Sequence, residues 1–291
     1  MASDRELAPA KINLALHVTR RRPDGFHELE SLFAFAQLSD EIHAQIAHSN
    51  QFVVKGPFGD AIPHSEDNLV LRAVAAFNSK WPDAVPHKLA VTLTKNLPVA
   101  AGIGSGSADA AAMLRVLAGL SRVEIEHEAL HEVALGLGAD VPACLSSKPA
   151  LVSGIGETIV PIKPFPEGHI VLINPLVPIS TPDVFGRLKR TNSSGLPKIT
   201  KPLEDVRTLA AWLETTRNDL AEPAIEIVPE IAKITGDLAK TAGCLIARMS
   251  GSGATVFGLY TSGDEAEKAG QEMTEKWPDS WIASGPLIAA A

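Results

Sequence analysis

Hydrophobic and polar residues alternate along several stretches of the first hundred residues, and this alternation is typical of half-buried strands. The stretches are residues 11–21, 28–38, 41–47, 52–56 and 88–95. Hydrophobic residues recur at helical spacing in residues 66–80, in the segment that follows residue 104, and in residues 127–138. The last of these ends at Gly136 and Gly138, as helices often do. The pattern predicts a first third rich in strands.

The second half of the chain continues with mixed elements. A strand is predicted at residues 169–175, after a proline-rich patch at residues 163–168. Residues 192–202 predict an exposed loop, and residues 244–260 predict two strands joined by a turn of glycine and serine. Because the strands are grouped and do not alternate strictly with helices, we predict an α+β fold. A domain boundary is placed near residue 155, which predicts domains at residues 1–155 and 156–291.

Composition narrows the classes of protein to consider. The chain has 291 residues, 45% of them hydrophobic and 21% charged, as in ordinary soluble domains. Its net charge of −8 gives no general attraction to nucleic acid or to an anionic membrane, so neither is expected as a partner. The charged N-terminal residues do not resemble a signal peptide, and a cytoplasmic protein is expected. Cys144 and Cys244 have no metal-type spacing and are expected to be buried free thiols.

The stretch PVAAGIGSGSADAAA, residues 98–112, places three alternating glycines directly before a predicted helix. Ordering such a row costs much backbone entropy, so a compensating interaction is expected. A strand, a glycine-rich loop and a helix N-terminus direct several backbone N–H groups at one place, which suits a phosphate. A flexible loop that only turns a corner is the alternative. Two familiar motifs do not match, since no Gly-Lys-Ser/Thr ends the loop and Ser107 replaces the third glycine of the dinucleotide fingerprint.

Four further segments accompany this loop: PAKINLALHV (9–18), RRPDGFHELESLFAFAQLSDEI (21–42), LGLGADVPACL (135–145) and MSGSGATVFGLY (249–260). Together the five segments resemble the superfamily of small-molecule kinases that contains galactokinase, homoserine kinase, mevalonate kinase and phosphomevalonate kinase. Each segment alone is a weak signal, but five in order, from Pro9 to about Tyr260, are a strong one. PAKINL, DGFHEL and LGADVP narrow the resemblance to the branch whose acceptor is a methylerythritol unit carrying a cytidine diphosphate.

The resemblance implies a two-domain kinase fold, with an N-terminal ribosomal-protein-S5-domain-2-like ATP-binding domain and a C-terminal α/β sandwich. It implies transfer of a phosphoryl group from ATP, accompanied by Mg²⁺, to the 2-hydroxyl of that acceptor, in the non-mevalonate route to isoprenoid precursors. No protein partner is inferred. The alternatives are a kinase for another small alcohol such as homoserine or mevalonate, a decarboxylating relative, and a nucleotide- or nicotinamide-binding protein without kinase chemistry.

The resemblance also assigns catalytic residues. Asp140 matches the family's catalytic aspartate, and Lys11 matches the lysine beside it. An aspartate within reach of a substrate hydroxyl takes its proton, while a nearby lysine keeps that carboxylate ionised. Asn13 lies on the same strand face as Lys11 and is expected to bind the acceptor or to orient Asp140. Without the resemblance, Lys11 would be an exposed strand lysine and Asp140 a helix N-cap.

For the acceptor, the resemblance points to an aromatic clamp. Phe26 stands where the family stacks an aromatic ring on cytosine, and His27 stands where a histidine bonds the edge of the base. Phe185 resembles the second aromatic ring, and Thr181 lies in the same substrate loop. The alternative is that both phenylalanines are core residues. A late turn is expected to approach the catalytic centre closely because it carries almost no side chain. This turn consists of Gly251, Ser252 and Gly253.

The residues matched to ATP binding run through the glycine-rich loop, and two more match the adenine pocket. They are Pro98, Val99, Ala100, Ala101, Gly102, Ile103, Gly104, Ser105, Gly106, Ser107 and Ala108, with Asn68 and Lys95. The family loop commonly reads GGGSS where this chain has GSGSA at residues 104–108. One hydroxyl is gained at Ser105 and one is lost at Ala108. We therefore assign no residue to the metal, and expect ATP oxygens and water to hold Mg²⁺.

Overall fold

The computed structural model describes residues 5–63, 65, 67–82, 84, 88–189 and 191–290. The chain forms two compact units from interleaved segments. The first unit comprises Met1–Ala10, Ser39–Val99 and Gly104–Ser147, and the second comprises Lys11–Leu38, Ala100–Ile103 and Lys148–Ala291. The chain thus passes between the units several times, whereas the predicted boundary near residue 155 divides it once. That boundary stays a prediction.

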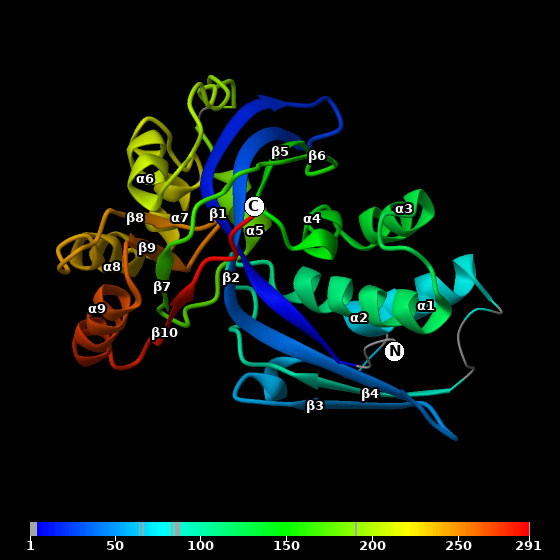
Figure 1. Cartoon of the computed structure of the whole chain (residues 1–291). Helices are drawn as coiled ribbons and strands as arrows, with labels where there is room; N and C mark the ends of the chain where they lie inside the picture. The colour runs from blue at the N-terminus through cyan, green and yellow to red at the C-terminus, as the bar shows by residue number, and fades with distance from the viewer. Residues whose placement is uncertain are drawn as a thin grey trace. The chain divides into compact units, whose positions relative to one another are not determined.

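Helices dominate one side of the first unit. They are α1 (Leu69–Lys80), α2 (Ser105–Ser121), α3 (Glu128–Leu137) and α4 (Val141–Ser146), which pack on one another (Figure 1). Helix α2 is buried around most of its circumference, as expected for a helix that is apolar on nearly every face. Its alanines, Ala108, Ala110 to Ala112 and Ala118, are all buried and let the neighbouring helices approach. The start of α2 is therefore held firmly at the end of the glycine-rich loop.

The strands of the first unit lead into that loop. The last part of β2 (His27–Ile46) pairs antiparallel with β4 (Leu89–Thr94), which pairs in parallel with β3 (Gln51–Lys55). A 3-10 helix (Gly59–Ala61) follows β3. Strand β4 ends just before residue 98, so the predicted order of strand, glycine-rich loop and helix is confirmed.

Two long strands run through both units. They are β1 (Arg5–Arg21), which starts earlier than predicted, and β2, with which it pairs. The prediction of two separate strands at residues 28–38 and 41–47 was wrong, because β2 continues through Ser39 and Asp40. The polar pair does not form a turn because Asp40 is buried and accepts hydrogen bonds from other backbone groups.

In the second unit, residues 29–33 of β2 pair with β5 (Ala150–Gly154), which pairs with β6 (Thr158–Pro161). A second sheet has the order β10-β7-β9-β8. Its strands are β7 (His169–Asn174), β8 (Ile246–Met249), β9 (Val256–Tyr260) and β10 (Trp281–Pro286). The pairing of β8 with β9 confirms the two strands predicted at residues 244–260, whereas β10 was not predicted.

The helices of the second unit are α5 (Thr181–Gly186), α6 (Val206–Glu214), α7 (Ala221–Ile227), α8 (Glu230–Leu238) and α9 (Gly263–Lys276) (Figure 1). Helices α6, α8 and α9 contact the strands of this sheet, and α7 contacts α5 and α8. Val171 and Val256 of the sheet pack in one core with Ile231 and Ile234 of α8 and Met273 of α9. Burying each such side chain contributes about 1.5–3 kcal/mol. The observed arrangement confirms the α+β class.

Residues 191–200 form neither helix nor strand, which confirms the predicted loop. Helix α1 begins three residues later than predicted, because Asn68 caps it by accepting a hydrogen bond from the Val70 N–H. Both cysteines are free, as predicted. Cys144 is buried, but the predicted burial of Cys244 is wrong, since this residue is only partly buried.

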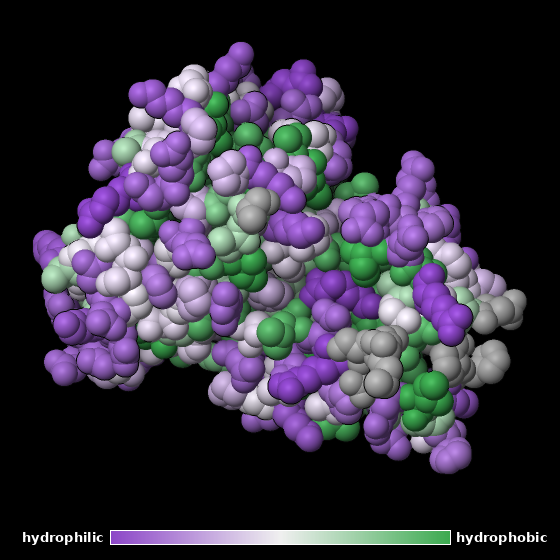
Figure 2. Space-filling model, in the orientation of Figure 1, coloured by the Kyte–Doolittle hydropathy of each residue, from purple (hydrophilic) through white to green (hydrophobic). Residues whose placement is uncertain are grey.

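Hydrophilic residues cover much of the face shown in Figure 2, with hydrophobic residues in small groups between them. This mixture agrees with the composition, in which 21% of residues are charged. Within the described part of the chain, we find no helix with the length and apolar character needed to cross a membrane.

Candidate active site

The centre of the glycine-rich loop packs against the late glycine and serine turn within the second unit. A Cβ atom on Gly102 would lie 2.6 Å from the carbonyl oxygens of both Ser250 and Gly253, and one on Gly251 would lie 2.8 Å from the Gly102 oxygen. Gly102 and Gly251 also have positive φ angles of 73° and 56°. Only glycine combines this conformation with so close an approach. The Ser250 hydroxyl donates to the Gly102 oxygen at 3.0 Å and fixes the contact.

Strand β1 brings Lys11 and Asn13 to the same place. The Lys11 N–H donates to the Ile103 oxygen at 3.0 Å, and the Asn13 N–H donates to Ser250 Oγ at 3.0 Å. Lys11 is only 4% exposed, so its interpretation as an exposed strand lysine was wrong. Its ammonium group donates to Asn13 Oδ1 at 2.7 Å and lies 4.6 Å from the centre of the Phe33 ring. A buried, oriented cation therefore lies beside the loop.

The orientation of Asn13 is fixed by groups that the sequence did not reveal. Its amide nitrogen donates to Ser31 Oγ at 2.9 Å, and Ser31 in turn donates to the Ala15 oxygen at 2.6 Å. The Asn13 oxygen accepts from Lys11, so only one orientation of the amide group satisfies both hydrogen bonds. Ser31 and Ser250 lie in two of the five segments, but the sequence does not indicate that they bond to Asn13.

The residues predicted to bind the acceptor lie in the second unit. The Thr181 and Ser252 hydroxyls are 2.7 Å apart, so the start of α5 contacts the late turn. The loop predicted around Thr181 was wrong, because Thr181 and Phe185 lie in this helix. The His27 and Phe185 rings stack with their centres 5.0 Å apart and an angle of 27° between their planes. Phe26 is 61% exposed, so it is not a core residue. Phe185 is partly buried and packs against the core, so its ring is firmly supported.

Burial lowers the pKa of His27, and the charge of Arg21 lowers it further. Its imidazole is therefore neutral at pH 7 and presents one donor and one acceptor nitrogen. Stacked on Phe185, this ring offers both a flat surface and a polar edge. Such a pair suits a planar nitrogenous base.

The first unit provides the other part of the loop, at the start of the 17-residue helix α2. Its N-cap is Gly104, which has a left-handed backbone and no side chain to cover the first N–H groups. Ser107 is partly buried, and its hydroxyl bonds to no residue that the structure describes. Ser105 donates instead to the Pro98 oxygen at 3.2 Å, and Ala108 is buried. The N-terminus of α2 and Ser107 together present donors that suit an anion.

Asp140 occupies the N-cap position of α4 but does not cap the helix, because its carboxylate makes no capping bond to a described residue. Asp140 thus occupies the predicted N-cap position without making the capping bond. The opposite end of α4 is held by Arg115 of α2, which donates to the oxygens of Cys144 at 2.8 Å and Leu145 at 3.3 Å. Arg115 thus fixes the short helix that carries Asp140. Nothing in the sequence indicates this contact.

Asn68 and Lys95, matched to the adenine pocket, have structural contacts in the first unit. Asn68 caps α1, and its amide nitrogen also donates to the Pro63 oxygen at 3.0 Å. Lys95 is buried, and its ammonium lies 2.6 Å from Asp40 and 2.6 Å from Asp109. Contact of these two residues with adenine stays a prediction.

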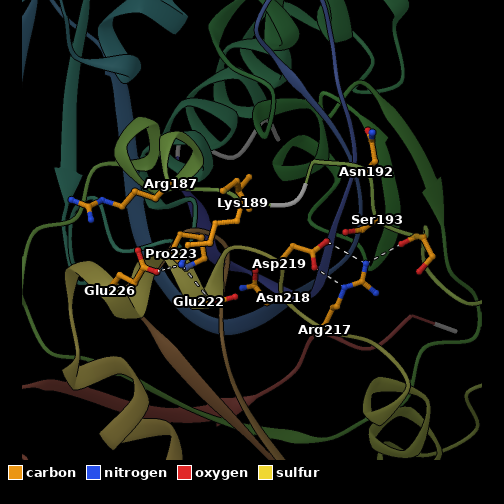
Figure 3. A pocket seen from close by; sticks show the side chains of 12 residues that line it. Arg187, Lys189, Asn192, Ser193, Arg217, Asn218, Asp219, Glu222, Pro223 and Glu226 are labelled. Carbon is orange, nitrogen blue, oxygen red and sulfur yellow. Dashed lines mark hydrogen bonds and ion pairs between the residues drawn. The ribbon is translucent and has the colours of Figure 1, made fainter.

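A cavity of about 860 Å³ lies elsewhere in the second unit (Figure 3). Its lining contains none of the predicted site residues and consists of Arg187, Leu188, Lys189, Asn192, Ser193, Ser194, Arg217, Asn218, Asp219, Glu222, Pro223 and Glu226. Arg217 pairs with Asp219 and Lys189 with Glu226, each at 2.6 Å. These two cations are therefore already paired with acidic side chains.

The described residues were also compared with the ligand sets of metal sites. Across the described ranges, no three His, Cys, Asp or Glu side chains gather where they could hold a metal ion. Ala108 offers no hydroxyl at the position where the loop differs from the usual pattern. No residue is assigned as a metal ligand.

Comparison with known proteins identifies the family of this chain. The GHMP kinases N terminal domain matches residues 68–148, and the GHMP kinases C terminal domain matches residues 197–279. The 4-diphosphocytidyl-2-C-methyl-D-erythritol kinase of Roseobacter denitrificans is 46% identical over 94% of this chain and 90% of its own. The kinase of the same name from Chelativorans sp. is 44% identical over 95% of this chain and 93% of its own.

Solved structures of kinases also superpose on this chain. A crystal structure of 4-(cytidine 5'-diphospho)-2C-methyl-D-erythritol kinase superposes with a TM-score of 0.80 at 31% identity, over 99% of this chain and 100% of that one. A homoserine kinase from Cytophaga hutchinsonii superposes with a TM-score of 0.70 at 19% identity, over 99% and 98%, which is a likeness of fold alone. The predicted two-domain kinase fold is confirmed. The chain therefore belongs to the 4-diphosphocytidyl-2-C-methyl-D-erythritol kinase family of the GHMP kinases.

Proposed function

We propose that the protein transfers a phosphoryl group from ATP to the 2-hydroxyl of 4-diphosphocytidyl-2-C-methyl-D-erythritol, giving the 2-phosphate and ADP. The observation that carries this proposal is the 46% identity, over 94% of the chain, with a kinase of that name. The reaction is a step of the non-mevalonate route to isoprenoid precursors. The protein is thus an ATP-dependent small-molecule kinase.

The glycine-rich loop, residues 98–108, is proposed to bind the ATP phosphates. The donors that support this assignment are the first N–H groups of α2 and the Ser107 hydroxyl, at the positive end of the helix dipole. The close packing of Gly102 against the late turn supports a fixed course for the loop. Donors that are ordered before the reaction stabilise the transferring group without reorganising during it.

The acceptor is proposed to bind through its cytosine ring. Phe26 and Phe185 provide the aromatic surfaces, and His27 provides the polar edge for the base. The neutral state of His27 supports this assignment, because it leaves one ring nitrogen to accept and one to donate. Thr181, Ser252 and Asn13 are proposed to contact the methylerythritol portion.

In the chemical step, the 2-hydroxyl oxygen forms a bond to the γ-phosphorus while the bond from that phosphorus to the β,γ-bridging oxygen breaks. We assign to Asp140 the hydroxyl proton, and to Lys11 the stabilisation of negative charge on the reacting oxygen. The burial of Lys11 supports its role, because a charge acts more strongly where water is excluded. ADP leaves with its own phosphate oxygens carrying the charge.

Mg²⁺ is proposed to accompany ATP, where it would neutralise charge on the phosphate oxygens. The protein would provide few ligands, since the loop has Ala108 and the described residues hold no carboxylate cluster. This fits an ion that keeps much of its water shell. A cytoplasmic location is proposed, and the net charge of −8 supports the lack of nucleic-acid or membrane partners.

The proposed function is tested by measuring ADP release with three acceptors under identical conditions. Only the cytidine diphosphate methylerythritol should support turnover, while homoserine and mevalonate should not. Efficient turnover of either small alcohol would assign the protein to another branch of the superfamily. ATP binding without turnover of any acceptor would instead favour a nucleotide-binding protein without this chemistry.

A further inference from the structure

Three charged side chains form a buried cluster in the first unit. The Lys95 ammonium lies 2.6 Å from Asp40 Oδ2 and 2.6 Å from Asp109 Oδ2, and no side chain of the three is more than 4% exposed. Burial lowers the pKa of Lys95, but the charges of Asp109 and Asp40 outweigh this effect and raise it. The lysine therefore stays charged and within hydrogen-bond distance of both aspartates, in a setting where removing one partner would leave a buried charge uncompensated.

The cluster contacts both ends of the glycine-rich loop. Asp40 Oδ1 accepts hydrogen bonds from the N–H groups of Asn96 at 2.6 Å and Leu97 at 2.8 Å, which are the two residues before Pro98. Asp109, on the first turns of α2, directly follows the last residue of the loop. The two ion pairs of Lys95 therefore connect the chain before the loop to the chain after it.

Neighbouring contacts hold the same region. The Lys95 N–H donates to the Lys55 oxygen at 2.7 Å, and the Phe58 N–H donates to the Lys95 oxygen at 3.2 Å. A Cβ atom on Gly56 would lie 2.5 Å from that oxygen, so the backbones are in close contact. The Ser105 hydroxyl donates to the Pro98 oxygen at 3.2 Å and joins the two ends of the loop directly. The Lys95 backbone is thus fixed to the end of β3.

We propose that Asp40, Lys95 and Asp109 form a clamp that sets the distance between the two ends of the glycine-rich loop and so orients its N–H groups for the ATP phosphates. The glycines of the loop lose much backbone entropy on ordering, and the clamp reduces this cost by fixing the loop ends in advance. Asp40 and Lys95 are positioning residues, because they act through the loop. The role in ATP binding rests on the proposed function; the clamp itself does not.

Amide hydrogen exchange of the full-length protein tests the clamp without using kinase activity. Asp40→Asn keeps the size of the side chain but turns an N–H group toward Lys95. We expect exchange of the amides that bond to the loop backbone, those of Lys11, Ala108 and Thr255, to accelerate by about tenfold or more, since a charged hydrogen bond of the clamp is lost. Lys80→Ala, which removes an exposed ion pair with Glu132 in the same unit, is the matched control and should leave these amides unchanged.

Unchanged exchange of the Lys11, Ala108 and Thr255 amides in folded Asp40→Asn would overturn the clamp. If that variant does not fold, two milder changes take its place. Ser105→Ala removes only the direct bond between the loop ends, and Asp109→Asn keeps an oxygen that accepts from Lys95. Either should accelerate exchange of the same amides, and normal exchange in both would equally overturn the proposal.

Kinetics then connect the clamp to ATP. In Asp40→Asn we expect the KM for ATP to rise by roughly 10- to 100-fold while the KM for the acceptor stays within about twofold, because only the phosphate donors are displaced. A purely structural role would lower thermal stability and leave the KM for ATP unchanged below the melting temperature, which would contradict the positioning role. If exchange accelerates but the unmutated protein phosphorylates no acceptor, the clamp stands and the proposed function fails.

Discussion

Asn13 donates its backbone N–H to Ser250 Oγ at 3.0 Å, although the two residues lie 237 positions apart in the sequence. The same hydroxyl donates to the Gly102 oxygen at 3.0 Å. One serine side chain therefore joins strand β1, the glycine-rich loop and the late turn within the second unit. Each of these segments was assigned to the candidate site separately, and Ser250 is the residue that they share.

Ser250→Ala should destabilise the protein, because the buried Asn13 N–H and Gly102 oxygen both lose their partner. Each buried group left unsatisfied costs about 1–3 kcal/mol, so the free energy of unfolding should fall by roughly 2 kcal/mol or more. Denaturation by urea measures this change. Ser280→Ala is the control, since the Ser280 hydroxyl bonds to no described residue, and equal stability losses in the two variants would contradict the assignment.

Gly102→Ala should damage both folding and ATP binding. The added Cβ would lie 2.6 Å from two carbonyl oxygens, at a φ angle of 73° that alanine disfavours. Gly236→Ala is the matched control, because Gly236 lies within α8 and nothing lies within 4 Å of its added Cβ. The control should be stabilised by roughly 0.5–1 kcal/mol. Urea denaturation measures the unfolding free energy of the two variants, and titration measures their affinity for ATP. Equal results for the two variants would contradict the close packing of Gly102.

Asp140→Asn should retain ATP binding and lower kcat by roughly two to four orders of magnitude, because an amide cannot take the hydroxyl proton. ATP titration and ADP release measure the two effects. Near-normal turnover in the folded variant would remove Asp140 from its role.

Lys11→Ala should also lower kcat, and combining it with Asp140→Asn should add little to the larger single effect, as for groups that act in one step. Lys11 belongs to the second unit and Asp140 to the first, so this double mutant is a direct functional test of their cooperation. Losses that simply multiply would indicate separate roles.

Phe26→Ala should raise the KM for the acceptor by roughly 5- to 150-fold, as expected when base stacking of about 1–3 kcal/mol is lost. Its stability should change little, because Phe26 is 61% exposed. Phe185→Ala should raise the same KM but also reduce stability, since Phe185 packs against the core. ATP affinity without acceptor should not change in either variant. A Phe26→Ala protein that unfolds, or that keeps a normal KM, would refute the aromatic clamp.

Asp109→Asn should change how stability depends on pH. Burial raises the pKa of Asp109 from 3.8 to about 7, with the charge of Lys95 lowering it and that of Asp40 raising it. Between these values the folded protein keeps a proton that the unfolded chain releases, so the contribution of Asp109 to stability falls as pH rises. The asparagine variant lacks this loss. The difference in unfolding free energy between the variant and the unmutated protein should therefore shift in favour of the variant by about 1 kcal/mol for each pH unit from pH 5 to pH 7.

Urea denaturation at pH 5, 6, 7 and 8 measures this difference. Since Lys95 and Asp40 are the charged groups in contact with Asp109, the comparison isolates the cluster from other titrating groups. A difference that is constant over the whole range would show that Asp109 has an ordinary pKa in the folded protein.

Local patterns in the sequence were enough to predict the elements that surround the site. It predicted the strand at residues 88–95, the glycine-rich loop and the helix after it, and the paired strands at 244–260, and the structure confirms all of them. These predictions succeed because hydrophobic periodicity and turn chemistry act over a few residues. The five ordered segments also identified the superfamily, and the family match agrees with them.

The tertiary structure alone decided which distant groups meet. The polar pair Ser39 and Asp40 resembled a break between strands, yet Asp40 is buried within one strand as a partner of Lys95. Helices α6 to α9 and strand β10 were likewise not predicted. A polar residue can be buried only where the fold supplies a partner, often far away in the sequence. Periodicity does not encode that partner. The partners of Asp40 and Ser250 are therefore known only from the folded structure.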